Sequence, residues 1–66
     1  MTLRINGEER TLPDLAMVSD LVHHLALPAA TLLIEHNDVA LRREEWNSAP
    51  LYEGDRVELL RIAAGG

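Results

Sequence analysis

The sequence predicts an α+β domain in which one main helix packs across a mixed β-sheet of four or five strands. Apolar and polar residues alternate near both ends of the chain, as they do in half-buried strands, and apolar residues between these ends recur at helical spacing. One helix over one face of a sheet buries the apolar side of both elements. At 66 residues, the chain is a single domain near the lower size limit for an independent core.

The N-terminal segment predicts a hairpin. Residues 1–5 alternate between apolar and polar side chains, and Asn6-Gly7 is a strong hairpin-turn signal because both residues tolerate positive φ. A second strand is expected from about Glu8 to Leu12, and Pro13 ends it because proline has no backbone N–H.

The next segment predicts the helix. Four apolar residues fall at positions i, i+3, i+4 and i+7 of one helical face: Val18, Leu21, Val22 and Leu25. Ser19 is the expected N-cap, and Asp20 is favourable near the positive end of the helix dipole. Pro28 is expected to stop the helix.

The second half of the chain predicts three further strands. Residues 32–36 form a short apolar run, Asn37-Asp38 turns the chain into a brief strand over 39–41, and residues 42–48 allow no more than a helical turn. Glu53-Gly54-Asp55 is a turn that leads into a final strand over 56–62. If the first and last strands lie side by side in the middle of the sheet, they run parallel with the hairpin at one edge, which is a β-grasp arrangement.

The final strand separates an inner face from an outer one. Val57 and Leu59 share one face, so Leu60 and Ile62 are exposed on the open side of the sheet if the first pair faces the helix. An exposed apolar pair is a candidate docking patch, although contact with loops at the strand end is the alternative. Trp46 is expected to close one end of the core, and contact with a partner is the alternative. The other predicted core residues are Leu3, Ile5, Val18, Leu21, Val22, Leu25, Ile34, Val57 and Leu59.

Composition excludes several classes of function. The net charge of −5 argues against nucleic-acid binding and suits a basic docking surface on a protein partner. There is no cysteine for disulfides or thiolate chemistry, and all six basic residues are arginine. With neither a signal peptide nor an apolar run of membrane-spanning length in the sequence, we expect a cytoplasmic protein that does not bind membranes.

The residues do not predict a catalytic or metal site within the domain. His23 and His24 are adjacent, so their side chains diverge by about 100° on a helix, and His36 is remote in sequence. Glu44-Glu45 is best interpreted as a solvated pair, because no nucleophile or oxyanion motif accompanies it. The four glycines are too far apart for a phosphate-binding loop.

The last four residues, Ala63-Ala64-Gly65-Gly66, are the candidate reactive segment. We expect residues 1–62 to form the domain and 63–66 a flexible tail, which reaches roughly 13 Å when extended. Two terminal glycines make a thin peptide that can carry a carboxylate into a narrow channel of another protein. A frayed end or a cloning scar is the alternative.

Together these features resemble the ubiquitin-like sulfur carriers, and most closely the carrier of thiamine biosynthesis. The resemblance covers nearly the whole chain. Its residues, in family order and spacing, are Asn6-Gly7, the helix over 18–25, Asn37 followed by Val39, Arg43 three residues before Trp46, Leu51, Glu53-Gly54-Asp55, Val57, Leu59 and Gly65-Gly66.

The resemblance implies a carrier rather than an enzyme. In such carriers an ATP-dependent adenylyltransferase of the ubiquitin-activating type converts the terminal carboxylate, here that of Gly66, to an acyl-adenylate. A sulfur donor, usually a cysteine desulfurase persulfide, then displaces AMP and leaves a thiocarboxylate, which supplies sulfur inside thiazole synthase. The implied partner-binding residues are Leu60, Ile62, Ala63, Ala64 and Gly65, and the chain itself holds no cofactor.

Two alternatives remain open. The small subunit of molybdopterin synthase has the same fold and tail, but it is usually longer and lacks the pattern of Arg43 and Trp46. A β-grasp interaction module that is never activated would make Gly65-Gly66 incidental.

Overall fold

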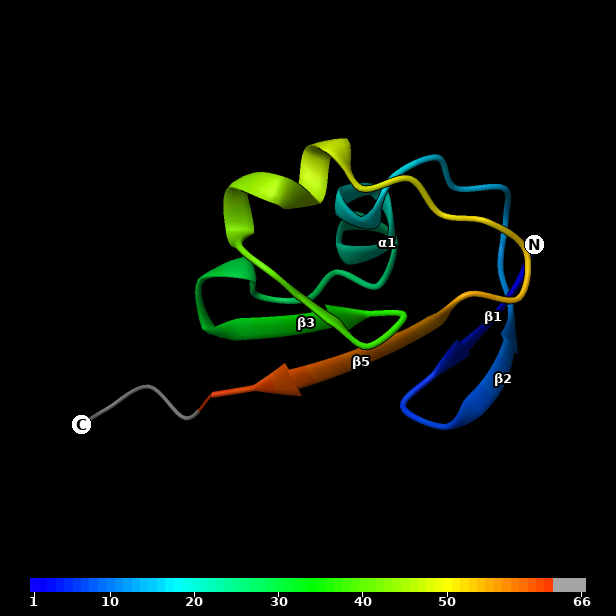
Figure 1. Cartoon of the computed structure of the whole chain (residues 1–66), viewed down its shortest axis with the longest axis horizontal. Helices are drawn as coiled ribbons and strands as arrows, with labels where there is room; N and C mark the ends of the chain where they lie inside the picture. Colours follow the sequence, from blue (N-terminus) through cyan, green and yellow to red (C-terminus); the bar gives the residue numbers. More distant parts are fainter. Residues whose placement is uncertain (63–66) are drawn as a thin grey trace.

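The central feature of the fold is a five-stranded sheet with strand order β2-β1-β5-β3-β4. The structure is a computed structural model that describes residues 1–62. Figure 1 shows α1 lying over one face of the sheet while β5 crosses its middle. The elements are β1 (Thr2–Ile5), β2 (Glu8–Thr11), α1 (Val18–His24), η1 (Ala29–Thr31), β3 (Leu32–His36), β4 (Val39–Leu41), η2 (Arg43–Ser48) and β5 (Arg56–Arg61).

The sheet is mixed in the way that the sequence predicts. β1 and β5 pair in parallel at the centre, whereas β1 with β2, β3 with β4 and β3 with β5 pair antiparallel. One main helix over such a sheet is the β-grasp arrangement, so the predicted fold class is confirmed, with five strands.

The start of α1 differs from the prediction. Ser19 was expected as the N-cap, but the helix begins at Val18 and Met17 is the N-cap residue. The reason is tertiary: the Val18 N–H donates to the Ala49 carbonyl at 2.9 Å, and Met17 pairs with Pro50 in an isolated bridge. The predicted role of Asp20 near the helix start is consistent with its carboxylate, which accepts a hydrogen bond from the Met17 N–H at 2.9 Å.

The core lies between α1 and the sheet. Trp46 is buried as predicted, and Leu25 and Leu59 are partly buried at its margin rather than inside it. Leu12, Leu32 and Leu51 are also buried, although they are not among the predicted core residues. The buried residues of the core are Leu3, Ile5, Leu12, Val18, Leu21, Val22, Leu32, Ile34, Trp46, Leu51 and Val57.

Two turn asparagines fix the position of β5. Asn6 and Asn37 both adopt positive φ, at 50° and 49°, which favours asparagine over most residues. The Asn37 Oδ1 accepts the Arg56 N–H at 2.8 Å. The Asn6 Oδ1 accepts the Leu59 N–H at 2.7 Å, and the Asn6 Nδ2 donates to the Leu59 carbonyl at 3.2 Å. Each side-chain amide therefore bonds the backbone of β5 where the neighbouring strand turns away.

Candidate functional site: the open face of the sheet

The face of the sheet opposite α1 exposes an apolar patch at the end of β5. Leu60 and Ile62 are 64% and 50% exposed, so their predicted exposure is confirmed. Leu33 of β3 is directly opposite Leu60 in the strand register and is 50% exposed. These three residues, Leu33, Leu60 and Ile62, are called the open-face patch below.

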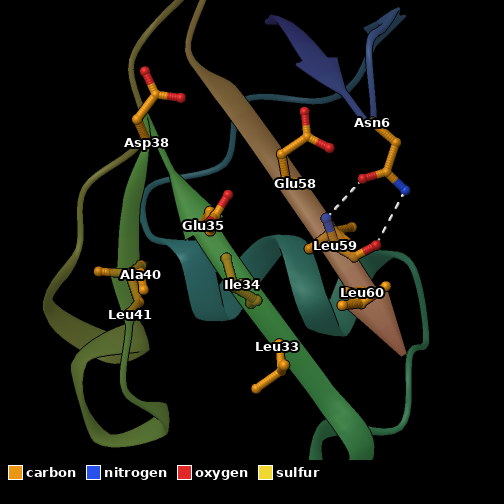
Figure 2. Close-up of a pocket in the computed structure, with 10 residues that line it drawn as sticks. All are labelled: Asn6, Leu33, Ile34, Glu35, Asp38, Ala40, Leu41, Glu58, Leu59 and Leu60. Atoms are coloured by element: carbon orange, nitrogen blue, oxygen red, sulfur yellow. Dashed lines mark hydrogen bonds between the residues drawn. The ribbon is translucent and has the colours of Figure 1, made fainter. Parts of the chain in front are cut away.

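An acidic region borders the open-face patch. Glu35 and Glu58 are paired directly across β3 and β5, and Asp38 lies beyond them. These side chains line a surface hollow of about 730 Å³ together with Leu33 and Leu60. Figure 2 shows how the lining side chains lie on β3 and β5 and around them. Like charges directly opposite in a sheet are unfavourable, so a cation at this position would relieve the repulsion between Glu35 and Glu58.

Asp38 is the acidic residue of this region that already has a cationic partner. Its Oδ2 lies 2.6 Å from Nη2 of Arg56, but both side chains are largely exposed. A solvent-exposed ion pair contributes little to stability. Glu35 and Glu58 therefore carry most of the negative charge that the hollow offers to a partner.

The sequence did not identify Leu33 as part of the site. Leu32, Leu33 and Ile34 form an uninterrupted apolar run, which is typical of a strand buried on both sides. The structure buries Leu32 and Ile34 but leaves Leu33 exposed, because only the helix side of the sheet is covered. One signal distinguishes a strand buried on one side from a strand buried on both: Leu33 pairs with Leu60, which is predicted to be exposed. This pairing follows from the register between β3 and β5, which the sequence alone does not give.

A polar cluster lies where β3 ends and β5 begins. The His36 Nε2 lies 2.8 Å from the Asp55 Oδ2, and the same oxygen accepts the Tyr52 N–H at 2.9 Å. Burial opposes ionisation of Asp55, but hydrogen bonds from His36, from the Tyr52 backbone and from Asn37 hold the pKa of its carboxyl below the usual 3.8. This cluster holds the turn before β5 against the end of β3.

The remaining polar residues that the sequence singled out have structural or solvent-facing positions. His23 and His24 are exposed on α1, and residues 1–62 contain no group of three side chains suited to a metal ion. Glu44 is exposed, whereas the Glu45 carboxylate accepts the Arg42 N–H at 2.7 Å at the start of η2. Within the same residues, no helix is long and apolar enough to cross a membrane.

The predicted reactive segment, Ala63, Ala64, Gly65 and Gly66, lies outside the described residues. Its part in partner binding and the role of the Gly66 carboxylate therefore stay predictions. The described chain leads to this segment from β5 through Ile62, which belongs to the open-face patch.

Comparisons with known proteins agree with this architecture. The model of the ThiS family matches residues 3–66. A crystal structure of the thiamine biosynthesis protein ThiS from Geobacter metallireducens is 30% identical, with a TM-score of 0.86 and full coverage of both chains. A solution NMR structure of a thiamine biosynthesis protein from the same organism is 30% identical, with a TM-score of 0.84 over all of this chain and 88% of that one.

A more distant relative is the uncharacterized protein ycf40 of Trieres chinensis. It is 25% identical over 65 residues, which cover 98% of this chain and 89% of that protein. The family match spans almost the whole sequence, and the similar solved structures have the same fold as the described domain. The chain therefore belongs to the ThiS family, the ubiquitin-like sulfur carriers of thiamine biosynthesis.

Proposed function

We propose that this chain delivers sulfur for thiazole formation as a thiocarboxylate on Gly66. The observation that supports the proposal most strongly is the family match, which extends over residues 3–66 and so includes Gly65-Gly66. The two similar solved structures are of one thiamine biosynthesis protein of Geobacter metallireducens, which favours the thiamine pathway over the molybdopterin pathway.

The proposed chemistry has two steps at one carboxylate. First, an adenylyltransferase joins the Gly66 carboxylate to the α-phosphate of ATP and releases pyrophosphate, so that the carboxyl carbon acquires AMP as a leaving group. Sulfide then attacks that carbon, expels AMP and leaves the thiocarboxylate directly. If a persulfide attacks instead, expulsion of AMP leaves an acyl disulfide between this chain and the donor, and a thiol then breaks its S–S bond, which releases the thiocarboxylate and forms a disulfide between that thiol and the donor. Thiazole synthase uses the new sulfur atom as a nucleophile.

The catalysis in this proposal belongs to partner enzymes. The sequence offers no glycine-rich loop for ATP phosphates, and its one proposed reacting group is a carboxylate, which needs a leaving group before it reacts. ATP and the sulfur donor are thus substrates of the partners, and this chain is a protein-sized cosubstrate. The cytoplasmic location expected from the sequence stays a prediction.

We propose the open-face patch as the surface that these partners recognise. Leu60 and Ile62 lie on the strand that leads to the reactive segment, and Leu33 extends the apolar area across to β3. Apolar contacts there would place the domain against a partner, while residues 63–66 enter its active site. A glutamate in the patch would bring an unpaired charge into that contact.

Intact mass measurement tests the function directly. The chain is incubated with the adenylyltransferase of its own organism, ATP and a sulfide source. We expect a mass increase equal to the exchange of one oxygen for one sulfur. An unchanged mass, with an established carrier modified under the same conditions, would favour the interaction module that is never activated.

Variants of the last two residues test the reacting group. Deleting Gly66 moves the carboxylate by about 3.3 Å, and a misplacement of about 1 Å can cost roughly 10²-fold in rate. We expect this deletion, Gly66→Ala and Gly65→Val to lose most ATP–pyrophosphate exchange without a change in thermal stability. Full activity of the deletion variant would exclude Gly66 as the reacting residue.

The patch is tested with Leu60→Glu and Ile62→Glu. Both residues are exposed, so we expect a folded domain that binds the adenylyltransferase more weakly. Tyr52→Glu is the matched control, because Tyr52 is 65% exposed and lies before β5, away from the patch. Wild-type affinity in both patch variants would exclude this surface from docking.

A further inference from the structure

A second surface of the domain lies beside β5, on the helix side of the sheet. β1 pairs with β5 only as far as Val57, whereas β5 continues to Arg61. Figure 1 shows β5 running on past the β1–β2 hairpin toward the C-terminal end. The last part of β5 therefore has β3 on one side and no strand of the described domain on the other.

The hydrogen-bond pattern shows which backbone groups face this open edge. The Ile62 N–H donates to the Thr31 carbonyl and the Asn37 N–H to the Arg56 carbonyl, so even-numbered residues of β5 bond toward β3. Backbone groups alternate along an antiparallel strand, so those of Leu59 and Arg61 point to the other side. Asn6 bonds both groups of Leu59, and Arg61 is the next residue along the same edge.

A groove of about 250 Å³ lies next to this edge, between the hairpin and the end of α1. Its apolar lining includes Leu25, Leu27 and Leu59, all of them partly buried. Its charged residues are Arg10 of β2 and Arg61 of β5, both exposed. Within residues 1–62 no carboxylate lines the groove and neither guanidinium is in an ion pair, although the chain carries a net charge of −5.

We infer that this groove binds an extended, acidic segment of the enzyme that activates the chain. The segment lies in line with β1 as an added strand, and its backbone pairs with that of Arg61. One of its apolar side chains packs among Leu25, Leu27 and Leu59, and one of its carboxylates lies between the guanidinium groups of Arg10 and Arg61. An open strand edge supplies backbone hydrogen bonds to such a segment, and the pockets beside it supply specificity. The inference rests on the proposed function, because it names the activating enzyme as the partner.

This contact has a specific use in the proposed reaction. The open-face patch and the groove lie on opposite faces of the sheet near the same end of β5. A partner that holds both faces fixes the direction in which the chain continues from Ile62. Positioning of the reacting carboxylate depends on that direction, and small displacements are costly in rate.

Charge reversal tests the groove without touching residues 63–66. We expect Arg10→Glu and Arg61→Glu each to weaken binding of the full chain to the purified adenylyltransferase about tenfold at low salt. Arg61→Lys retains the charge and should bind more tightly than Arg61→Glu. Arg42→Glu is the matched control, since Arg42 is an exposed arginine before η2 and the net charge changes equally. Thermal melting establishes that each variant is folded.

Amide hydrogen exchange tests the added strand. In the complex with the adenylyltransferase, we expect exchange of the Arg61 N–H to slow by about tenfold or more, because pairing with a strand removes that group from water. Wild-type affinity of Arg10→Glu, equal loss in Arg42→Glu, or unchanged exchange at Arg61 would each overturn the inference. Failure of the wild-type chain to support pyrophosphate exchange would instead count against the proposed function.

Discussion

The hydrogen bonds from Asn6 to Leu59 predict a measurable loss of stability when Asn6 is replaced. Asn6→Gly keeps the positive φ of the turn but removes both bonds, at 2.7 and 3.2 Å. A protein hydrogen bond contributes about 0.5–1.5 kcal/mol net. Asn6 is exposed, so water replaces part of this loss, and we expect a decrease of about 1–2 kcal/mol in the free energy of unfolding.

Asn6→Ala separates the backbone contribution from that of the side chain. Alanine loses the same two bonds and must also adopt a φ near 50°, which costs roughly 1–2 kcal/mol for a residue with a Cβ. We therefore expect Asn6→Ala to be less stable than Asn6→Gly. The difference will be smaller than the full φ cost, because glycine also increases the entropy of the unfolded chain.

Urea unfolding of the purified domain measures these differences, with unchanged m-values showing that the unfolded state is comparable. Asn47→Ala is the control, because Asn47 is exposed in η2, and a surface change away from such features stays within about 0.5 kcal/mol. Exchange of the Leu59 amide should also be faster in both Asn6 variants. If Asn6→Ala is as stable as the Asn47 control, the bonds to Leu59 do not stabilise β5.

Three further predictions concern the core, the polar cluster and the acidic region. Leu21 is fully buried, so Leu21→Ala should cost about 2–5 kcal/mol, and an unchanged melting midpoint would contradict its place in the core. The lowered pKa of Asp55 means that its ionised form stabilises the fold above the unfolded-state pKa, and this contribution is lost as pH falls through the folded-state pKa. The stability difference between wild type and Asp55→Asn should therefore shrink as urea unfolding is repeated from pH 6 to below about pH 3.8; a constant difference would contradict this assignment. Glu58→Gln removes the repulsion between Glu58 and Glu35, so the free energy of unfolding from urea titrations at low salt should rise by about 0.2–1 kcal/mol. No increase would show that solvent already screens the pair.

Much of the fold could be predicted because its local signals agree with its tertiary structure. Asn6-Gly7 and Asn37-Asp38 both adopt the positive φ values that their residue types favour, and the strands over 32–36 and 39–41 have the predicted bounds. Alternation in β5 also predicted correctly that Val57 is buried and Leu60 exposed. In each case, a few neighbouring residues determine the conformation.

The parts that could not be predicted depend on contacts between distant segments. The helix starts at Val18 rather than after Ser19 because the Val18 N–H donates to the Ala49 carbonyl and the Leu51 N–H donates to the Ala16 carbonyl. Leu33 is exposed because no element covers that side of β3, which an apolar run by itself does not indicate. The register between strands also brings Glu35 opposite Glu58. All three features depend on how distant segments are arranged in the fold, so the residues next to each position in the sequence do not indicate them.

The register of β5 matters because this strand serves the core and the proposed docking surface with alternate residues. A shift by one residue would turn Glu58 toward the helix and Leu59 toward solvent, since the side-chain period of a strand is two. Three contacts oppose such a shift: Asn37 bonds Arg56, Asn6 bonds Leu59, and His36 holds Asp55 just before the strand. All three come from neighbouring strands or their turns, so the sheet itself fixes which side chains form the open-face patch. The same contacts fix where the chain continues beyond Ile62. In the proposed function, the position that the Gly66 carboxylate reaches in a partner depends on that point.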